Sequence, residues 1–182
     1  MPIRFARPAD AQAVHAIYAH YARETAVTFA DEAPSAAHYA AQMADRRYPF
    51  LVAEEDGQVT GFVYAGEFRT KAAFRWDVEL TLYLAPGQTG RGLGSALMSA
   101  CLTLLTAQGY VNAYSCVTLP NPASIALHRR FGFAELGVFP RTGYKLGRWH
   151  DVIWLEKPLA APDGPPPEPR PLTDDDLTGG CL

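Results

Sequence analysis

One stretch in the middle of the chain restricts the fold more than any other. Between residues 76 and 85, apolar and polar side chains alternate, which is the pattern of a strand with one buried and one open face. Residues 86–94 then read Pro-Gly-Gln-Thr-Gly-Arg-Gly-Leu-Gly, and leucines recur at helical spacing to about residue 108. The fold must therefore join a long strand to a helix through a glycine-rich turn.

The glycine-rich turn favours an anion site. Gly90, Gly92 and Gly94 let the backbone approach a ligand closely, and the helix that follows directs its free N–H groups into the turn. A tight connection without a ligand remains the alternative. The turn lacks the Gly-Lys-Ser/Thr of a Walker loop, and its glycines come at every second residue, unlike a dinucleotide fingerprint. No acidic residue ends the next strand, where Cys116 stands.

Composition and charge exclude several classes of function. Hydrophobic residues make up 48% of the 182 residues and charged residues 19%, with a formal net charge of -3, which fits a soluble globular enzyme without general attraction for nucleic acid or anionic lipid. No apolar run reaches the roughly 20 residues of a membrane span, and the N-terminus lacks a secretion signal. Cys101, Cys116 and Cys181 show no metal-ligand spacing, so we expect reduced thiols, no metal and a cytoplasmic protein.

The remaining elements alternate between strands and helices. Asp56-Gly57 predicts a tight hairpin, Ser35 is a good start for a helix, and Pro122 suits a first helical position. Strands are expected near residues 3–5, 50–54, 58–64, 111–117, 133–139 and 151–157, and helices near residues 10–21, 35–47, 92–108 and 121–131. The pattern indicates a mixed α/β domain over residues 1–158.

The composition changes after Pro158. Residues 159–182 are rich in proline and then in acidic residues and glycine, so they bury little apolar surface to offset their ordering entropy. We expect an extended or disordered tail, with an arm that docks on the domain as the alternative. Ending the chain after Pro158 is then expected to leave stability and turnover nearly unchanged.

The motifs together resemble the GNAT superfamily of acetyltransferases, and within it the phosphinothricin and methionine sulfone (sulfoximine) acetyltransferase group. The resemblance spans residues 2–158. It is carried by the runs at residues 48–54, 78–84, 92–94, 121–128 and 143–151. It implies the GNAT fold, a mixed and mostly antiparallel seven-stranded sheet with helices on both faces, whose strands splay after the fourth to admit acetyl-CoA.

The resemblance assigns the acetyl-CoA site to the turn and its flanking elements. Thr89 stands where the family's phosphate loop usually has Gln or Arg, so we expect weakened rather than lost affinity. Arg91 is expected to add a charge contact with a phosphate oxygen. Asn121 matches an asparagine that approaches the cofactor and is also a good helix N-cap. The implied cofactor-binding residues are Leu82, Tyr83, Leu84, Thr89, Gly90, Arg91, Gly92, Leu93, Gly94, Ser95 and Asn121.

Two residues are the candidates for catalysis. Amine attack on a thioester requires a neutral amine, and Glu79, on the open face of its strand, is the expected general base. A solvated strand glutamate is the alternative. His128 occupies the place of the family's usual acid for the leaving thiolate, and it either serves as that acid, orients the cofactor sulfur or a neighbouring side chain, or is a structural histidine. Tyr83 and Tyr144 are further possible proton donors.

The resemblance places Phe29, Arg69, Lys71 and Phe74 around the substrate. Arg69 and Lys71 are two residues apart in a strand-end segment, so both can project the same way toward a carboxylate or phosphinate, although a solvated basic face is an equal alternative. The group often has Arg in place of Lys71 and Tyr in place of Phe74, which leaves the substrate's identity open. Lys145 and Trp149 are further candidates for this pocket, Trp149 being equally compatible with the core.

These inferences converge on an enzyme that moves the acetyl group of acetyl-CoA to the α-amine of a small amino-acid-like substrate. Cys101 and Cys116 are expected in the core, so we expect direct attack without an acyl-enzyme. The group's members are commonly homodimers, and the resemblance implies the same here. The rivals are a GNAT enzyme for another amine (a peptide N-terminus, a polyamine, an aminoglycoside) and a non-catalytic acyl-CoA-binding module.

Overall fold

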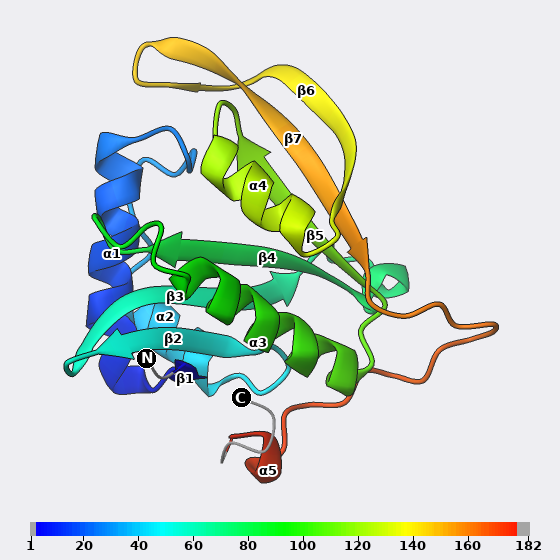
Figure 1. Cartoon of the computed structure of the whole chain (residues 1–182). Helices are drawn as coiled ribbons and strands as arrows, with labels where there is room; N and C mark the ends of the chain where they lie inside the picture. Colours follow the sequence, from blue (N-terminus) through cyan, green and yellow to red (C-terminus); the bar gives the residue numbers. More distant parts are fainter. Residues whose placement is uncertain (1–2, 178–182) are drawn as a thin grey trace.

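A computed structural model describes residues 3–177, which form a twisted sheet with helices on both of its faces (Figure 1). The seven strands lie in the order β1-β2-β3-β4-β5-β7-β6. They are β1 (Ile3–Phe5), β2 (Phe50–Glu55), β3 (Gln58–Glu67), β4 (Asp77–Leu84), β5 (Asn112–Thr118), β6 (Ala134–Lys145) and β7 (Arg148–Pro158). Within these residues β4 and β5 run parallel, and the other neighbours are antiparallel. The predicted GNAT-type architecture is confirmed.

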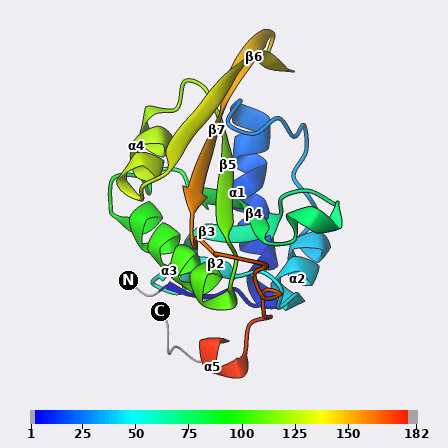
Figure 2. The same cartoon turned by 90° about the vertical axis from the view of Figure 1, so that its right-hand side faces the viewer.

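Two pairs of helices cover opposite faces of the sheet (Figure 2). The helices are α1 (Ala11–Glu24), α2 (Ala36–Ala44), α3 (Leu93–Gln108), α4 (Pro122–Arg130) and α5 (Asp174–Leu177), with 3-10 turns η1 (Pro8–Asp10) and η2 (Ala72–Phe74). Figure 2 shows α3 and α4 on one side of the strands and α1 and α2 on the other. Ser35 caps α2 by accepting a hydrogen bond from the backbone N–H of His38, as predicted from its residue type.

The two faces have separate cores, because side chains along a strand alternate in direction. On β2, Leu51 and Ala53 pack with α3, whereas Phe50 and Val52 pack with α1 and α2. The four residues are at most 4% exposed. Strands buried on both sides read as continuous apolar runs, and residues 50–53 are such a run. Both faces of β2 are therefore buried.

The strands β4 and β5 separate after a short pairing. They are in register over three pairs, the last being Glu79 with Tyr114. Beyond this point β4 stays paired with β3 as far as Leu84, and β5 stays paired with β7 as far as Thr118. Each diverging strand is therefore held by its outer neighbour, and the sheet forks at its centre. The splay predicted after the fourth strand is confirmed.

The hairpin of β6 and β7 is longer than the sequence pattern predicted. The expected strands ended near residue 139 and began again near 151, but both continue to a turn at Leu146 and Gly147, which have φ angles of +50° and +76°. The register shifts between Phe139 and Gly143. Because Pro140 and this shift interrupt the alternation, the pattern of residues 140–150 did not show the strands.

The structure favours the alternative of a docked arm over the expected extended or disordered tail. Residues 159–177 lie against the domain, and Leu172 is 5% exposed within the α3-side core. The tail's backbone is paired with distant side chains and carbonyls. The indole N–H of Trp76 donates to Pro167 O (2.8 Å), Arg170 N donates to Gln108 O (2.8 Å), and Leu172 N donates to Arg46 O (2.8 Å). These partners are remote in sequence, so composition alone could not reveal them. Cys181 lies outside the described residues.

Removing the docked tail should destabilise the protein. A chain that ends after Pro158 loses the buried Leu172 and the hydrogen bonds of Trp76 and Gln108. Truncating a buried leucine alone costs about 2 kcal/mol or more, so we expect the melting temperature to fall by about 4–8 °C. The measurement is thermal unfolding followed by circular dichroism. The exposed Asp163→Ala variant is the matched control and should melt like the wild type, and a truncated chain with unchanged melting would show that the tail does not dock in solution.

Candidate active site

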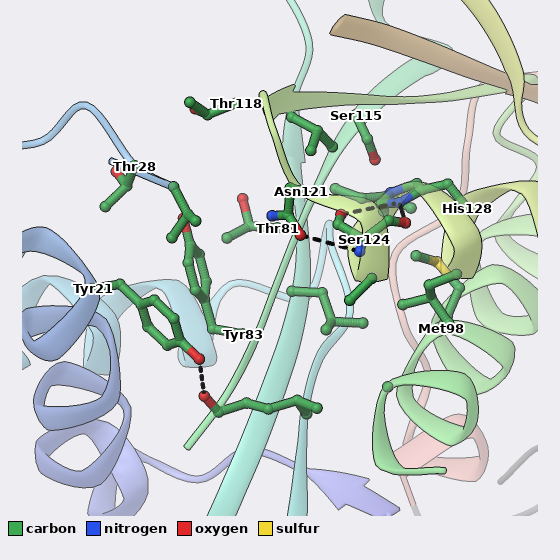
Figure 3. Close-up of a pocket in the computed structure, with 18 of the residues that line it drawn as sticks. Tyr21, Thr28, Thr81, Tyr83, Met98, Ser115, Thr118, Asn121, Ser124 and His128 are labelled. Carbon is green, nitrogen blue, oxygen red and sulfur yellow. Dashed lines mark hydrogen bonds between the residues drawn. The ribbon is translucent and has the colours of Figure 1, made fainter. Parts of the chain in front are cut away.

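A cavity of about 770 Å³ fills the fork between β4 and β5. Figure 3 shows Tyr21, Thr28 and Tyr83 on one wall. On the opposite wall it shows Asn121, which precedes α4, with Ser124 and His128 of α4. The glycine-rich turn forms one end of the cavity, and Glu79 and Cys116 line it where the strands part. The fork thus brings together the motifs that the sequence places far apart.

The turn before α3 has the geometry of an anion site. Gly90 and Gly92 line the cavity with φ angles of +78° and +83°, which side chains rarely adopt. Gly92 is the N-cap of α3, so the first N–H groups of the helix are directed toward the turn. Thr89, Gly94 and Ser95 also line the cavity. The backbone can therefore bind a pyrophosphate at this end.

Two residues predicted for the same site direct their side chains away from the cavity. The Arg91 guanidinium forms an ion pair of 2.8 Å with Glu55 and a short hydrogen bond with Gln88, and it does not line the cavity. Its predicted contact with a phosphate is therefore not in place, because Glu55 at the end of β2 attracts the cation. The Leu93 side chain is fully buried in the core, where it anchors the start of α3.

The second half of β4 presents free backbone to the cavity. Leu82, Tyr83 and Leu84 line it, as predicted, and none of them is paired with β5. The Tyr21 hydroxyl donates a hydrogen bond of 2.8 Å to Leu84 O, so this carbonyl is occupied. The remaining groups on the β5 side are available to the amides of a pantetheine arm. An extended, polar-edged ligand therefore fits along this strand.

Asn121 is a helix cap that also faces the cavity. Its Oδ1 accepts a hydrogen bond from Ser124 N (3.2 Å) at the start of α4, and the residue lines the cavity. The predicted capping role is confirmed, and its contact with the cofactor stays a prediction.

Glu79 lies half-buried at the point where β4 and β5 part. Burial raises the pKa of its carboxyl, and the nearby positive charge of Arg69 partly opposes this rise. A carboxylate with a raised pKa is a better proton acceptor near neutral pH. The structure therefore places a half-buried carboxyl where the predicted mechanism requires a base, and the role of Glu79 as that base stays a prediction.

His128 is 6% exposed and lines the cavity from α4. Its Nδ1 lies 2.8 Å from Ser124 O, and a carbonyl can only accept, so Nδ1 carries the hydrogen. Burial lowers the pKa of the imidazole, with the Ser124 hydrogen bond opposing, so the ring is held neutral with Nε2 as an acceptor. Of the predicted roles, this tautomer favours orienting a neighbouring group over donating a proton.

The residues predicted around the substrate divide into two groups. Phe29 lines the cavity. The Arg69 guanidinium lies over the ring of Phe68 (4.2 Å to the centroid) and beside that of Trp154 (5.4 Å), near enough to Glu79 to affect its pKa. Such stacking uses the face of the guanidinium, so that it does not occupy the N–H donors at its edge. Arg69 is exposed and does not line the cavity, and its positive charge acts on the Glu79 carboxyl from outside the cavity lining.

Lys71 and Phe74 do not line the cavity. The chain leaves β3 at Glu67, Lys71 is the N-cap of η2, and Phe74 packs edge-on against Phe68. The expected strand-end geometry, with both basic residues projecting the same way, is therefore replaced by a turn. Composition gave no sign of this short helix.

Two further expectations are corrected. Cys116 is exposed to the cavity, on the open face of β5, instead of lying in the core, whereas Cys101 is buried as predicted. Trp149 is 50% exposed on the hairpin. The cavity also gains Tyr18, Thr28, Ser115 and Thr118, which the sequence analysis missed. The strand alternation gave one usable signal for Thr118. Residues two apart on a strand share a face, so Thr118 lies on the same face as Cys116.

Comparisons with known proteins decide the family. The chain matches the acetyltransferase (GNAT) domain family over residues 3–154. The chain belongs to the GNAT acetyltransferases. It is 36% identical to the phosphinothricin N-acetyltransferase of Streptomyces viridochromogenes over 94% of both chains. It is also 36% identical to the L-methionine sulfoximine/L-methionine sulfone acetyltransferase of Salmonella typhimurium, over 90% of this chain and 99% of the relative.

The solved structures agree with this assignment. A phosphinothricin acetyltransferase of the GNAT superfamily from Sinorhizobium meliloti, in complex with acetyl-CoA, superposes with a TM-score of 0.86 at 34% identity, over 92% of this chain and 93% of that one. The present protein is therefore an acetyl-CoA-dependent N-acetyltransferase, and the turn and β4 are suited to that co-substrate. Among residues 3–177, no helix is long and apolar enough to span a membrane, and no cluster of three potential metal ligands occurs.

The acid limb of activity should follow the charge of Glu79. As a base the carboxyl must be ionised, so activity falls as the pH drops through its pKa. Because Arg69 opposes the increase of this pKa, Arg69→Met should move the acid limb of kcat/KM to higher pH. The control Arg23→Met, on the exposed end of α1, should leave the limb in place.

Glu79→Gln should lower kcat by roughly 10²–10⁴, and a full-rate Gln variant would remove Glu79 from the mechanism.

Proposed function

We propose that the enzyme acetylates the α-amine of a small amino acid whose side chain carries a tetrahedral, polar or anionic group, such as phosphinothricin, methionine sulfone or methionine sulfoximine. The observation that carries this proposal is the Arg69 guanidinium, held on the rings of Phe68 and Trp154 beside Glu79. A cation meets the acceptor's anionic group while the carboxylate faces its amine. The names of the relatives support the same class of acceptor.

The reaction proposed is direct transfer. The amine nitrogen attacks the thioester carbon, one N–H proton passes to the Glu79 carboxylate directly or through a water, and the C–S bond breaks to release the thiolate, which then takes up a proton. His128, whose Nδ1 donates to Ser124 O, uses its free Nε2 to orient the cofactor sulfur or a neighbouring side chain. The aromatic wall of Phe29 excludes water from one side of the acceptor.

The cysteines of the described chain do not favour an acyl-enzyme. Burial raises the pKa of Cys101 to about 12, and burial together with the charge of Glu79 raises that of Cys116 to about 11. Both thiols are therefore protonated near neutral pH, and the thiolate is the nucleophilic form. Cys116 lies in the cavity without the charge environment that would activate it.

A panel of amines tests the proposal. Thiol release from acetyl-CoA should be fast with phosphinothricin, methionine sulfone and methionine sulfoximine, and slow with spermidine and an alanyl peptide, because the Arg69 cation repels a polyamine. Because Arg69 is exposed, Arg69→Glu should raise the acceptor KM by roughly two- to fivefold, or about 0.5–1 kcal/mol for an exposed charge contact, with little change in the acetyl-CoA KM. An enzyme that ignores the three amino acids and acetylates the peptide or spermidine would overturn the proposed acceptor while remaining a GNAT enzyme.

We further propose that two copies pair through the β6–β7 hairpin. This edge of the sheet exposes an unusually apolar surface, and contiguous surfaces of this kind mark interaction sites. The exposed side chains are Leu136 (55%), Val138 (47%), Phe139 (52%), Tyr144 (62%), Leu146 (60%) and Trp149 (50%). Sedimentation should give twice the 19.9 kDa of one chain, and Phe139→Glu should give the single mass. A wild-type protein that sediments as one chain would exclude the pairing.

A further inference from the structure

The loop between α1 and α2 forms part of the cavity wall, and Thr28 and Phe29 line the cavity from it. The loop has no regular secondary structure over residues 29–35, so its shape depends on contacts with neighbouring elements. Figure 3 shows Thr28 and Tyr83 together on the α1 side of the cavity, across from α4. The position of this loop therefore shapes this wall of the cavity.

The side chain of Lys145 reaches this loop from the far end of β6. Its ammonium donates hydrogen bonds to Thr28 O and Ala30 O, both at 2.7 Å. Lys145 is 8% exposed, and no ion pair is formed with a carboxylate within the described residues. Burial lowers the pKa of its ammonium, and Asp31 opposes this. Burying a cation that is bound only by neutral carbonyls costs free energy of folding. We therefore expect a function for Lys145 at this position.

Other contacts join the same loop to the hairpin and to α1. The Phe29 ring packs against Gly143 so closely that an added Cβ would lie 2.2 Å from it, and its centroid is 6.2 Å from that of His150. His150 in turn donates from Nε2 to Lys145 O (3.0 Å). Thr28 shares a hydrogen bond of 2.6 Å with the Tyr18 hydroxyl. The loop is thus held from both sides at the residues that face the cavity.

We propose that Lys145 is a positioning residue for the amine acceptor, whose ammonium fixes the Thr28–Ala30 backbone so that Thr28 and Phe29 form the acceptor wall of the cavity. The inference rests on the proposed function for the identity of the acceptor. The two hydrogen bonds from Lys145 to Thr28 O and Ala30 O, here called the clamp, are independent of it. The glycine-rich turn that suits acetyl-CoA belongs to a different part of the chain. Loss of the clamp should therefore weaken binding of the amine acceptor and leave binding of acetyl-CoA unchanged.

The test compares Lys145→Met with Lys157→Met, which makes the same chemical change on β7 at a residue that does not line the cavity. Hydrogen exchange of the peptide containing residues 25–35, measured by mass spectrometry, should be at least tenfold faster in Lys145→Met and unchanged in Lys157→Met. The acceptor KM should rise at least tenfold in Lys145→Met, while the acetyl-CoA KM stays within about twofold of the wild type, the split that a positioning role requires.

Gly143→Ala provides a second variant that leaves the ammonium intact. Its new methyl group displaces the Phe29 ring, so the acceptor KM should again rise without a change for acetyl-CoA. Unchanged exchange of residues 25–35 in a folded Lys145→Met variant would overturn the clamp. An equal rise of both KM values would assign Lys145 a general structural role and overturn the proposal as well. If Lys145→Met does not fold, a wild-type acceptor KM in Gly143→Ala overturns it.

A wild-type enzyme inactive on every amino acid tested would overturn the proposed acceptor, and the exchange measurement would still decide the clamp, because it needs no turnover. The two failures are therefore distinguishable.

Discussion

The three-residue parallel pairing of β4 with β5 is the constraint on which the rest of the structure depends. At Glu79 the two strands part, and each is held by an antiparallel neighbour. Backbone groups that a continuous sheet would pair are thereby left free, and unpaired backbone in a buried place needs a partner. The cavity, the free edge of β4 and the half-buried carboxylate all follow from that one separation.

The cavity separates two kinds of chemistry along its length. At one end the helix N-terminus and the glycines present backbone donors, which suit a pyrophosphate without a side-chain charge, and Arg91 is engaged by Glu55. At the other end the Glu79 carboxyl lines the cavity, and the charge of the nearby Arg69 limits the rise of its pKa. One end of the cavity thus presents backbone donors, and the other presents side-chain charge.

Two segments without regular secondary structure are held on the domain by hydrogen bonds with residues distant in sequence. Residues 159–177 cover the end of α3 through hydrogen bonds with Gln108 and Trp76, and the loop after α1 is held by Lys145 from the opposite part of the chain. Both segments have polar or proline-rich sequences that, alone, would not order. Their order comes from donors and acceptors that the folded sheet presents at fixed positions.

The sequence by itself determined the elements whose signals are local. The alternation of residues 76–85, the glycines after it, the Asp56-Gly57 hairpin and the Asn121 cap each have a short-range physical cause. The alternation also placed Glu79 on the open face of its strand, whereas its predicted role as base came from the family resemblance. Only the tertiary structure decided which of Arg69 and Lys71 comes near the base, that Cys116 faces the cavity, and that the tail docks. These outcomes depend on where β3 ends and on partners distant in sequence, which spacing along the chain does not encode.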